Sequence, residues 1–334
     1  MGNIDFNKQG TVMPLPPQKG IEEKFLIDVL QGLASSPKYL QSKYFYDPKG
    51  DKLFQDIMNC EEYYPFDCEL EIFSERTAEI AGAILREPGA FDLIELGAGD
   101  CTKSSYLLEY LVGEKVDFTY MPIDISYNTI AYLNKILPER IQGLNVTGLN
   151  GEYFDMLKKA AKASSRRKVV LFMGSNLGNM PPADARLFCK ELRAHLNPGD
   201  LALIGIDLKK NPHTVLAAYN DKKGITAAFN LNLLSRINRE LAGDFKIGNF
   251  SHYATYDPES GGCKSFLVSK VDQQVTLSGE YEFKFAKDEC IYMEISQKYD
   301  LKEIGRMGEL AGFKTEENFL CRKKWFVDTV WSAI

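Results

Sequence analysis

Four short apolar segments, separated by stretches of helical periodicity, constrain the fold of this chain more than any other feature. Residues 102–112, 127–137 and 182–196 lie between these segments and have the spacing of helices. Strands that are apolar throughout are buried on both faces, and strands joined by helices run parallel. The pattern predicts a Rossmann-like parallel α/β core over residues 70–207. The four segments are FDLIELGAGD (91–100), FTYMPIDIS (118–126), KVVLFMGSNLGN (168–179) and DLALIGIDL (200–208).

The pattern changes after the fourth apolar segment. A helical stretch over about 212–242 is followed by alternating apolar and polar segments, which end with IYMEISQKY at 291–299. Such alternation is typical of an antiparallel sheet with one covered face. We interpret residues 21–69 and 208–334 together as a second, α+β domain that is built from both chain ends. Residues 1–20 contain three prolines among polar residues and are expected to form a mobile tail.

Composition and charge exclude several classes of function. The 334 residues carry a formal charge of −6 and no long Lys/Arg cluster, which predicts no nucleic-acid partner. No run of about 18 apolar residues exists, so no membrane span is expected. Seven scattered cysteines without a CxxC motif favour reduced thiols in a cytoplasmic protein, and three scattered histidines predict no metal site. The oligomeric state stays open, with a monomer as the working expectation.

A glycine loop, ELGAGDCTK, follows the first strand and opens a helix. Gly97 allows the tight turn and Gly99 allows a ligand close to the backbone, but Thr102 stands where a dinucleotide-binding loop has its third glycine. Asp124 ends the second strand, where one carboxylate can accept from both hydroxyls of a ribose. The combination favours S-adenosylmethionine, whose carboxylate Lys103 could meet. The alternative is a tight βα turn and an aspartate that caps the next helix.

Asn179 follows the third apolar segment, at the edge of the sheet where open α/β folds bind ligands. Its amide oxygen could accept from a substrate amine, or the residue could simply support a left-handed turn beside Gly178. Tyr46, Tyr64 and Tyr219 lie in turn-like contexts, where their hydroxyls could hold a carboxylate. A packed tyrosine with its hydroxyl at the surface is the alternative. Asn230 and Asn232 could line a pocket, but we interpret them as helix packing and solvated residues.

The segment IYMEISQKY alternates with a strand period, so Glu294 and Ser296 share one face. That face either meets water or lines a pocket that holds a ligand with two polar atoms. The alternation alone leaves both interpretations open.

Ten stretches, taken in order, resemble the histidine N-alpha-methyltransferases of ergothioneine biosynthesis and the wider family that includes fungal dimethylallyltryptophan N-methyltransferases. The resemblance runs from about residue 21 to the carboxyl end. It implies an S-adenosylmethionine methyltransferase core with an added substrate domain, and three successive methyl transfers to the alpha-amine of histidine, giving hercynine. The stretches are YFYDPKG, EEYYP, ELGAGDCTK, PIDIS, GSNLGN, DLKKNP, AAYND, GITAAFNLNLL, INREL and MEISQKY.

The resemblance also assigns site residues by position. A methionine that lines the imidazole pocket in some relatives falls near Ser265 here. Asn179 and Tyr64 are expected to act in catalysis. The cofactor contacts implied are Gly97, Lys103, Asp124, Glu152 and Tyr153, and the substrate contacts implied are Tyr64, Asn179, Tyr219, Glu294 and Ser296.

Three alternatives to histidine methylation stay open from the sequence. The enzyme could methylate another amino acid or an aromatic amine such as a tryptophan derivative. A nicotinamide oxidoreductase is less compatible with Thr102. A non-catalytic protein that binds S-adenosylmethionine is the third alternative, and the sequence identifies no general base.

Overall fold

The computed structural model describes residues 19–334 and contains a seven-stranded sheet in the order β12-β13-β6-β5-β2-β3-β4. The strands β4, β3, β2, β5 and β6 pair in parallel, and β13 lies antiparallel between β6 and β12. The four strands expected from the apolar segments are confirmed. Their bounds, with those of the other three, are β2 (Phe91–Leu96), β3 (Phe118–Asp124), β4 (Leu149–Asn150), β5 (Arg167–Phe172), β6 (Leu201–Asp207), β12 (Phe313–Leu320) and β13 (Phe326–Ala333).

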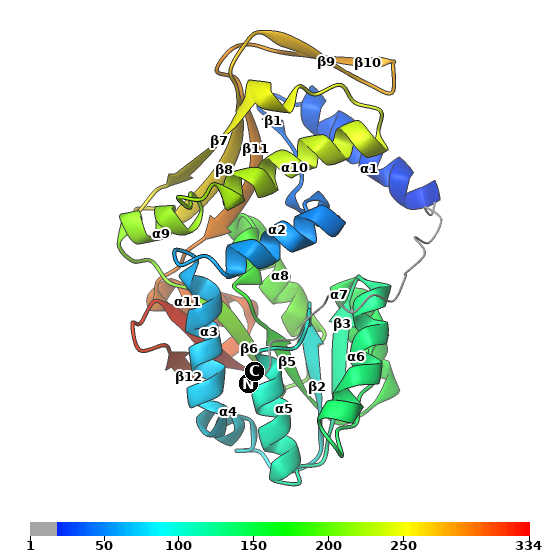
Figure 1. Cartoon of the computed structure of the whole chain (residues 1–334). Coiled ribbons are helices and arrows are strands. Elements are labelled where there is room, and N and C mark those ends of the chain that lie inside the picture. Colours follow the sequence, from blue (N-terminus) through cyan, green and yellow to red (C-terminus); the bar gives the residue numbers. More distant parts are fainter. Residues whose placement is uncertain (1–18) are drawn as a thin grey trace.

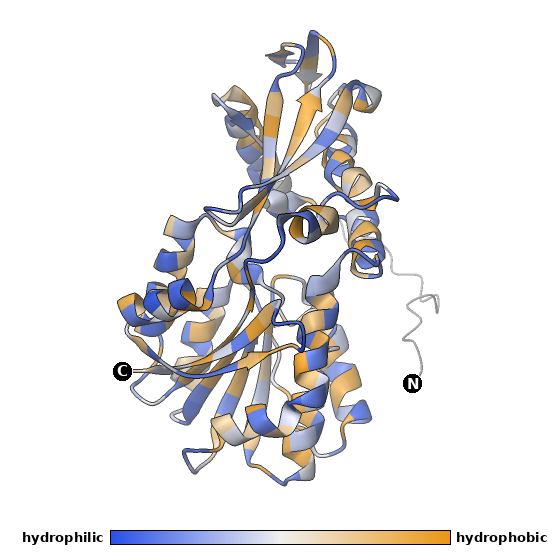
Figure 2. Ribbon diagram, turned by 90° about the vertical axis from the view of Figure 1, so that its left-hand side faces the viewer, coloured by the Kyte–Doolittle hydropathy of each residue, from blue (hydrophilic) through white to orange (hydrophobic). Residues whose placement is uncertain are grey.

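Helices cover both faces of this sheet, as continuous burial along β2 and β6 requires. Two separate apolar clusters fill the layers between the sheet and its helices. In Figure 2 the central strands carry mostly hydrophobic colours, whereas the outer helices alternate between hydrophobic and hydrophilic. One face is covered by α3 (Tyr64–Glu75), α4 (Thr77–Ile84), α5 (Ser104–Gly113) and α6 (Tyr127–Arg140), and the other by α7 (Tyr153–Ala163), α8 (Pro182–Ala194) and α11 (Leu301–Ala311).

A second region lies above the core in Figure 1 and contains a four-stranded sheet in the order β1-β11-β8-β7. The helices α1 (Lys19–Ala34), α2 (Pro48–Met58) and α10 (Ile225–Glu240) enclose its own apolar cluster, and α9 (Pro212–Ala218) leads into it. The antiparallel sheet expected from the alternating segments is therefore present. The strands are β1 (Lys38–Tyr39), β7 (Phe250–Tyr256), β8 (Gly262–Ser269) and β11 (Cys290–Gln297), with a separate hairpin of β9 (Gln273–Leu277) and β10 (Tyr281–Phe285).

The boundaries of these two regions differ from the expected ones. Residues 208–334 were expected in the second region, but α11, β12 and β13 pack on or pair with the core sheet. Their apolar residues fit either sheet, so periodicity alone could not assign them. Similarly, α3 begins at Tyr64, inside the 21–69 segment, and packs on the core. A tail was expected over residues 1–20. Positions 1–18 lie outside the described residues, and positions 19 and 20 belong to α1.

Residues 19–334 also contain three short 3-10 helices: η1 (Ser42–Tyr44), η2 (Asn176–Asn179) and η3 (Ile247–Asn249). The one that matters for the site is η2, which follows β5 at the carboxyl edge of the sheet. Within residues 19–334, no helix has the length and apolar character needed to cross a membrane.

Candidate cofactor and substrate site

The candidate site lies where the carboxyl ends of the parallel strands meet the second region. The loop after β5 forms η2 and packs directly against β11. A Cβ atom on Gly178 would stand only 2.7 Å from the backbone oxygen of Gln297, so the two backbones are as close as glycine allows. The structure thereby brings Asn179, at the end of η2, close to the strand that carries Glu294 and Ser296.

The glycine loop after β2 has the conformation that its sequence predicts. Gly97 and Gly99 both have positive φ, at 73° and 55°. A Cβ on Gly97 would lie 2.8 Å from the hydroxyl of Tyr153, whereas a Cβ on Gly99 would meet nothing within 4 Å. The loop therefore leaves open space above Gly99, and the hydroxyl of Tyr153 borders it.

Asp124 ends β3 beside this loop. One of its oxygens accepts from the backbone N–H of Ser126 at 2.8 Å, and the other makes only a long 3.4 Å contact with the N–H of Gly99. Burial raises the pKa of Tyr153 to about 12, and the negative charges of Asp124 and Glu152 add to that shift, so these three side chains are gathered around the loop. The second oxygen of Asp124 retains acceptor capacity, which a ribose diol would use.

Lys103 precedes α5 and forms an ion pair with Glu69 of α3. The Glu69 side chain is fully buried and also accepts from the backbone N–H of Gly174, at 2.8 and 2.9 Å. Its contact with a cofactor carboxylate stays a prediction, since Lys103 already has an anionic partner here. Sequence reasoning missed Glu69, because a glutamate in an amphipathic helix ordinarily faces water.

Tyr219 and Ser296 come together although 77 positions separate them along the chain. Their hydroxyl oxygens are 2.7 Å apart. The ammonium group of Lys298 donates to both, at 2.7 and 2.8 Å, and pairs with Asp207 at 2.7 Å. Sequence reasoning missed Lys298 and Asp207. Their proximity depends on β11 reaching the carboxyl end of β6, which no local pattern encodes.

Glu294 lies on β11 directly opposite Ser265 of β8, next to a β-bulge at Met293. Burial raises the pKa of the Glu294 carboxyl, although hydrogen bonds from Ser265 and Asn230 oppose that shift. The Asn230 amide nitrogen lies 3.5 Å from the Glu294 carboxylate, and its amide oxygen is buried without a hydrogen-bond partner. Asn230 thus faces this cluster, contrary to the interpretation that it only packs within its helix.

Tyr64 does not join the cluster of Tyr219 and Ser296. Its hydroxyl donates to Asp207 at 2.8 Å and accepts from Lys210 at 2.9 Å, and its ring packs edge-on against Trp325. The neighbouring Tyr63 instead has its ring 6.3 Å from that of Tyr219. Both adjacent tyrosines therefore lie near the expected substrate contacts: Tyr63 through its ring, and Tyr64 through Asp207, which also pairs with Lys298.

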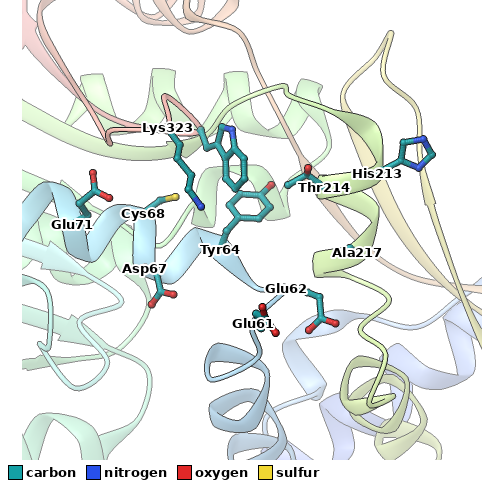
Figure 3. Close-up of a pocket in the computed structure, with 11 residues that line it drawn as sticks. Glu61, Glu62, Tyr64, Asp67, Cys68, Glu71, His213, Thr214, Ala217 and Lys323 are labelled. Carbon is teal, nitrogen blue, oxygen red and sulfur yellow. The ribbon is translucent and has the colours of Figure 1, made fainter.

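The other face of Tyr64 lines an open cavity of about 490 Å³ between α3 and α9. Figure 3 shows the Tyr64 ring between Lys323, the acidic side chains of α3 and the α9 residue Thr214. None of Asn179, Tyr219, Glu294 or Ser296 lines this cavity. We place the candidate site at the junction with β11 rather than in this cavity, because the expected cofactor and substrate residues converge at the junction.

Taken together, these features define a class of protein. The sheet order, with one antiparallel strand inserted next to the edge, positions a glycine loop and a strand-end carboxylate that fit a ribose without a pyrophosphate. A second region contributes a polar cluster that includes Tyr219, Ser296 and Lys298 and reaches the end of β6 at Asp207. The class is that of the S-adenosylmethionine-dependent methyltransferases.

The chain belongs to the family described as histidine-specific, SAM-dependent methyltransferases, whose profile matches residues 25–333. It is 33% identical to a histidine N-alpha-methyltransferase from Mycolicibacterium smegmatis over 90% of both chains. It is 32% identical to ergothioneine biosynthesis protein 1 from Neurospora crassa, over 83% of this chain and 31% of that protein. An L-tryptophan methyltransferase from Psilocybe serbica is 28% identical, over 88% of this chain and 89% of that one.

Proposed function

We propose that this enzyme transfers methyl groups from S-adenosylmethionine to the alpha-amine of L-histidine, three in succession, to give hercynine for an ergothioneine-type pathway. The observation that carries the proposal is the polar face of β11. It offers a carboxylate, Glu294, and a hydroxyl, Ser296, two residues apart. A neutral imidazole has one N–H donor and one nitrogen acceptor, which match an acceptor and a donor on the protein.

Glu294 takes the role of acceptor for the imidazole N–H. Its oxygen is already oriented by the side chains of Ser265 and Asn230, whose hydrogen bonds lower the carboxyl pKa against the effect of burial. Ser296 takes the role of donor to the other ring nitrogen, and the hydroxyl of Tyr219 is hydrogen-bonded to it at 2.7 Å. This division of roles accounts for histidine rather than an aliphatic amino acid.

Asn179 takes the role of orienting the amine. It sits on η2, which is held against β11 through Gly178 and anchored at Ser175, whose hydroxyl accepts from the backbone N–H of Asp207 at 3.1 Å. Bound S-adenosylmethionine would supply an electrophilic methyl group on a sulfonium, held by Gly97, Asp124 and Tyr153. Because such a displacement needs an aligned, neutral amine, positioning by Asn179 supplies much of the rate.

The direct test is a mass-spectrometric assay. Purified protein with S-adenosylmethionine would receive each amino acid separately, and products with one, two or three added methyl groups would be measured. The expected result is complete conversion of histidine to a trimethylated product. Methylation of a different amino acid with none of histidine would overturn the proposal.

The second candidate substrate is an aromatic amine such as a tryptophan derivative. It is favoured by Ser265, which stands opposite Glu294 where some relatives carry a methionine, so the neighbouring wall differs. The relative from Psilocybe serbica that is named for tryptophan supports the same alternative. Comparing kcat/KM for histidine and tryptophan separates the two candidates, since an indole has a ring N–H for Glu294 but no acceptor nitrogen for Ser296.

The cellular setting proposed is the cytoplasm, with a small-molecule amino acid as the only partner required. All seven cysteines are free thiols, and six of them are buried, which supports a reducing compartment.

A further inference from the structure

Each N–H of the Lys298 ammonium group has an oxygen partner. The side chain follows β11 and is entirely buried, and its nitrogen has three oxygen neighbours: Asp207 at 2.7 Å, Tyr219 at 2.7 Å and Ser296 at 2.8 Å. An ammonium group has three protons and cannot accept a hydrogen bond. Each proton of Lys298 is therefore used once, and both hydroxyl oxygens act as acceptors toward it.

This arrangement fixes the direction of the remaining hydroxyl protons. Tyr219 and Ser296 lie 2.7 Å apart, so one hydroxyl donates to the other. The pair has two protons, and one of them is consumed by that bond. A single O–H proton remains, and it must point away from Lys298, because that nitrogen only donates.

We propose that Lys298 is a positioning residue that turns the Tyr219–Ser296 pair into an obligatory donor for the substrate. The atom recognised is an acceptor, either an oxygen of the amino-acid carboxylate or the unprotonated ring nitrogen. This inference rests on the proposed function, because it concerns the same substrate pocket. It adds a residue that acts on the substrate through two hydroxyl groups, and its charge also lowers the pKa of the Glu294 carboxyl against the effect of burial.

Asp207 holds Lys298 in place. Burial alone would raise the pKa of the Asp207 carboxyl, but Lys298 and Lys210 hold it below its usual value, so the group stays ionised. Its two oxygens also accept from Tyr64 and Lys210. One carboxylate and two ammonium groups leave one net positive charge beside the pocket, which favours the anionic end of an amino acid.

The experiment compares Lys298→Met with wild type. Methionine has a similar length and no charge, so Tyr219 and Ser296 lose their fixed donor. The KM for histidine and the Kd for histidine in the presence of S-adenosylhomocysteine are expected to rise about 10- to 100-fold, the effect of losing a hydrogen bond to a charged group. The KM for S-adenosylmethionine is expected to change less than twofold. Lys209→Met is the matched control, since Lys209 pairs with Glu303 away from the pocket.

A second variant keeps the test independent of folding. Lys298→Met combined with Asp207→Asn removes the buried Lys298–Asp207 pair without leaving an uncompensated anion, and the amide oxygen that replaces the carboxylate can still accept from Lys210. Its thermal midpoint is expected near that of wild type, with histidine binding still weakened. Unchanged histidine KM and Kd in a folded variant would overturn the inference. A purely structural role would instead weaken both substrates together with the thermal midpoint.

A double-mutant cycle tests whether Lys298 acts through the hydroxyl pair. The effects of Lys298→Met and Ser296→Ala on histidine KM are expected to be far from additive, because both disturb one donor; additive effects would contradict the inference. Histamine lacks the carboxylate and therefore identifies the acceptor. If Lys298→Met also weakens histamine binding, the acceptor is the ring nitrogen. If histamine binding is unchanged, the acceptor is the carboxylate. Failure of wild type to methylate histidine overturns the proposed function alone, and the Lys298 comparison then uses the amino acid that is methylated.

Discussion

Two opposing effects act on the pKa of the Glu294 side chain. Burial raises its pKa, yet Ser265 and Asn230 both donate to its carboxylate and favour the ionised form. Ser265 is almost fully buried, and so is Asn230. Ordering three polar side chains in a buried place costs free energy unless each finds a partner, so a ligand that completes this network stabilises it.

Replacing Glu294 with alanine should weaken histidine methylation specifically. The substitution removes the acceptor for the imidazole N–H, which is worth about 1.5–3 kcal/mol, so kcat/KM is expected to fall about 10- to 100-fold. Steady-state kinetics with histidine measure this. Glu289→Ala is the matched control, because Glu289 precedes the same strand but pairs with Lys38 at the surface. An equal kcat/KM in wild type and Glu294→Ala would sink the proposed contact.

Asp328 lies on β13 near the buried Glu69, and a Cβ on Gly205 would stand close to both carboxyl groups. Burial raises the pKa of Asp328 far above its usual value, and the negative charge of Glu69 adds to the shift. Glu69 also forms an ion pair with Lys103. The raised pKa favours the protonated form of Asp328 in the folded state relative to the unfolded state.

The sign of the resulting pH dependence follows from linkage. A group with a raised pKa in the folded state contributes stability below its unfolded pKa and loses it as pH rises toward the folded pKa. Asp328→Asn removes the titratable group and with it the decrease in folding stability at rising pH. The thermal midpoint of the variant should therefore exceed that of wild type by about 2–4 °C at pH 8 and by less at pH 5. Calorimetry at the two pH values measures this. A difference that does not depend on pH would contradict the protonated Asp328.

Sequence reasoning reached part of the candidate site at the level of single residues. Strand parity placed Glu294 and Ser296 on one face, because the bulge at Met293 precedes both and leaves their spacing intact. It did not reach Lys298, whose role depends on a contact with Asp207 across two regions of the chain. The choice of Tyr64 over the adjacent Tyr63 stays a prediction, since two adjacent tyrosines differ only in direction and direction depends on how α3 begins.

The helix α10 shows how one element supports the site. Asp221 precedes it and accepts from the backbone N–H groups of Ile225 and Thr226, at 2.9 and 2.7 Å. Burial alone would raise the pKa of Asp221, but these backbone donors hold it below its ordinary value of 3.8. The same helix contains Asn230, which contacts Glu294. The anchoring of the first turn therefore helps to position Asn230 against Glu294.

Asp221→Ala should destabilise the protein and weaken histidine binding together. Loss of a carboxylate at a helix start costs about 1–2 kcal/mol, and Asp221→Asn, which keeps one acceptor oxygen, should cost less. The wild-type advantage is present above pH 4 and is lost as pH falls through the depressed pKa of the folded state. Denaturant unfolding at pH 7 and pH 3 measures the difference. An advantage that is equally large at pH 3 would rule out the charged form as its source.

The strands and helices themselves were more accessible to sequence reasoning than their assembly. β2, β3, β5 and β6 are apolar throughout, and that composition alone predicted both their type and their burial. β12 and β13 were not assigned to the same sheet. Their apolar residues match the second region equally well, and only pairing with β6 distinguishes the two.

The molecule as a whole works through the contact between its two regions. The glycine loop belongs to the core, whereas Glu294 and Ser296 belong to the second region, so neither region forms the site alone. η2 and β11 meet at Gly178, where backbone approaches backbone without a side chain between them. We therefore expect a displacement at this junction to change how the proposed site residues are aligned.

Gly178→Ala should separate the two halves of the site slightly. The added methyl group would stand 2.7 Å from the Gln297 backbone oxygen, which cannot move as a side chain can. Overpacking of this kind costs about 1–3 kcal/mol, so the KM for histidine is expected to rise about tenfold or more. Gly248→Ala is the matched control, since its Cβ would meet nothing within 4 Å. Equal kinetics in both variants would show that the junction tolerates displacement.

The position of β13 has a consequence for synthesis of the protein. β6 has its full set of hydrogen bonds only when residues 326–333 pair with it, and residues 208–312 intervene before the closing hairpin begins. While the ribosome makes that stretch, the nascent chain displays the apolar edge of β6 without a partner. Such an edge attracts other chains. Sheltering this edge until β13 has been translated would protect the nascent chain from such pairing.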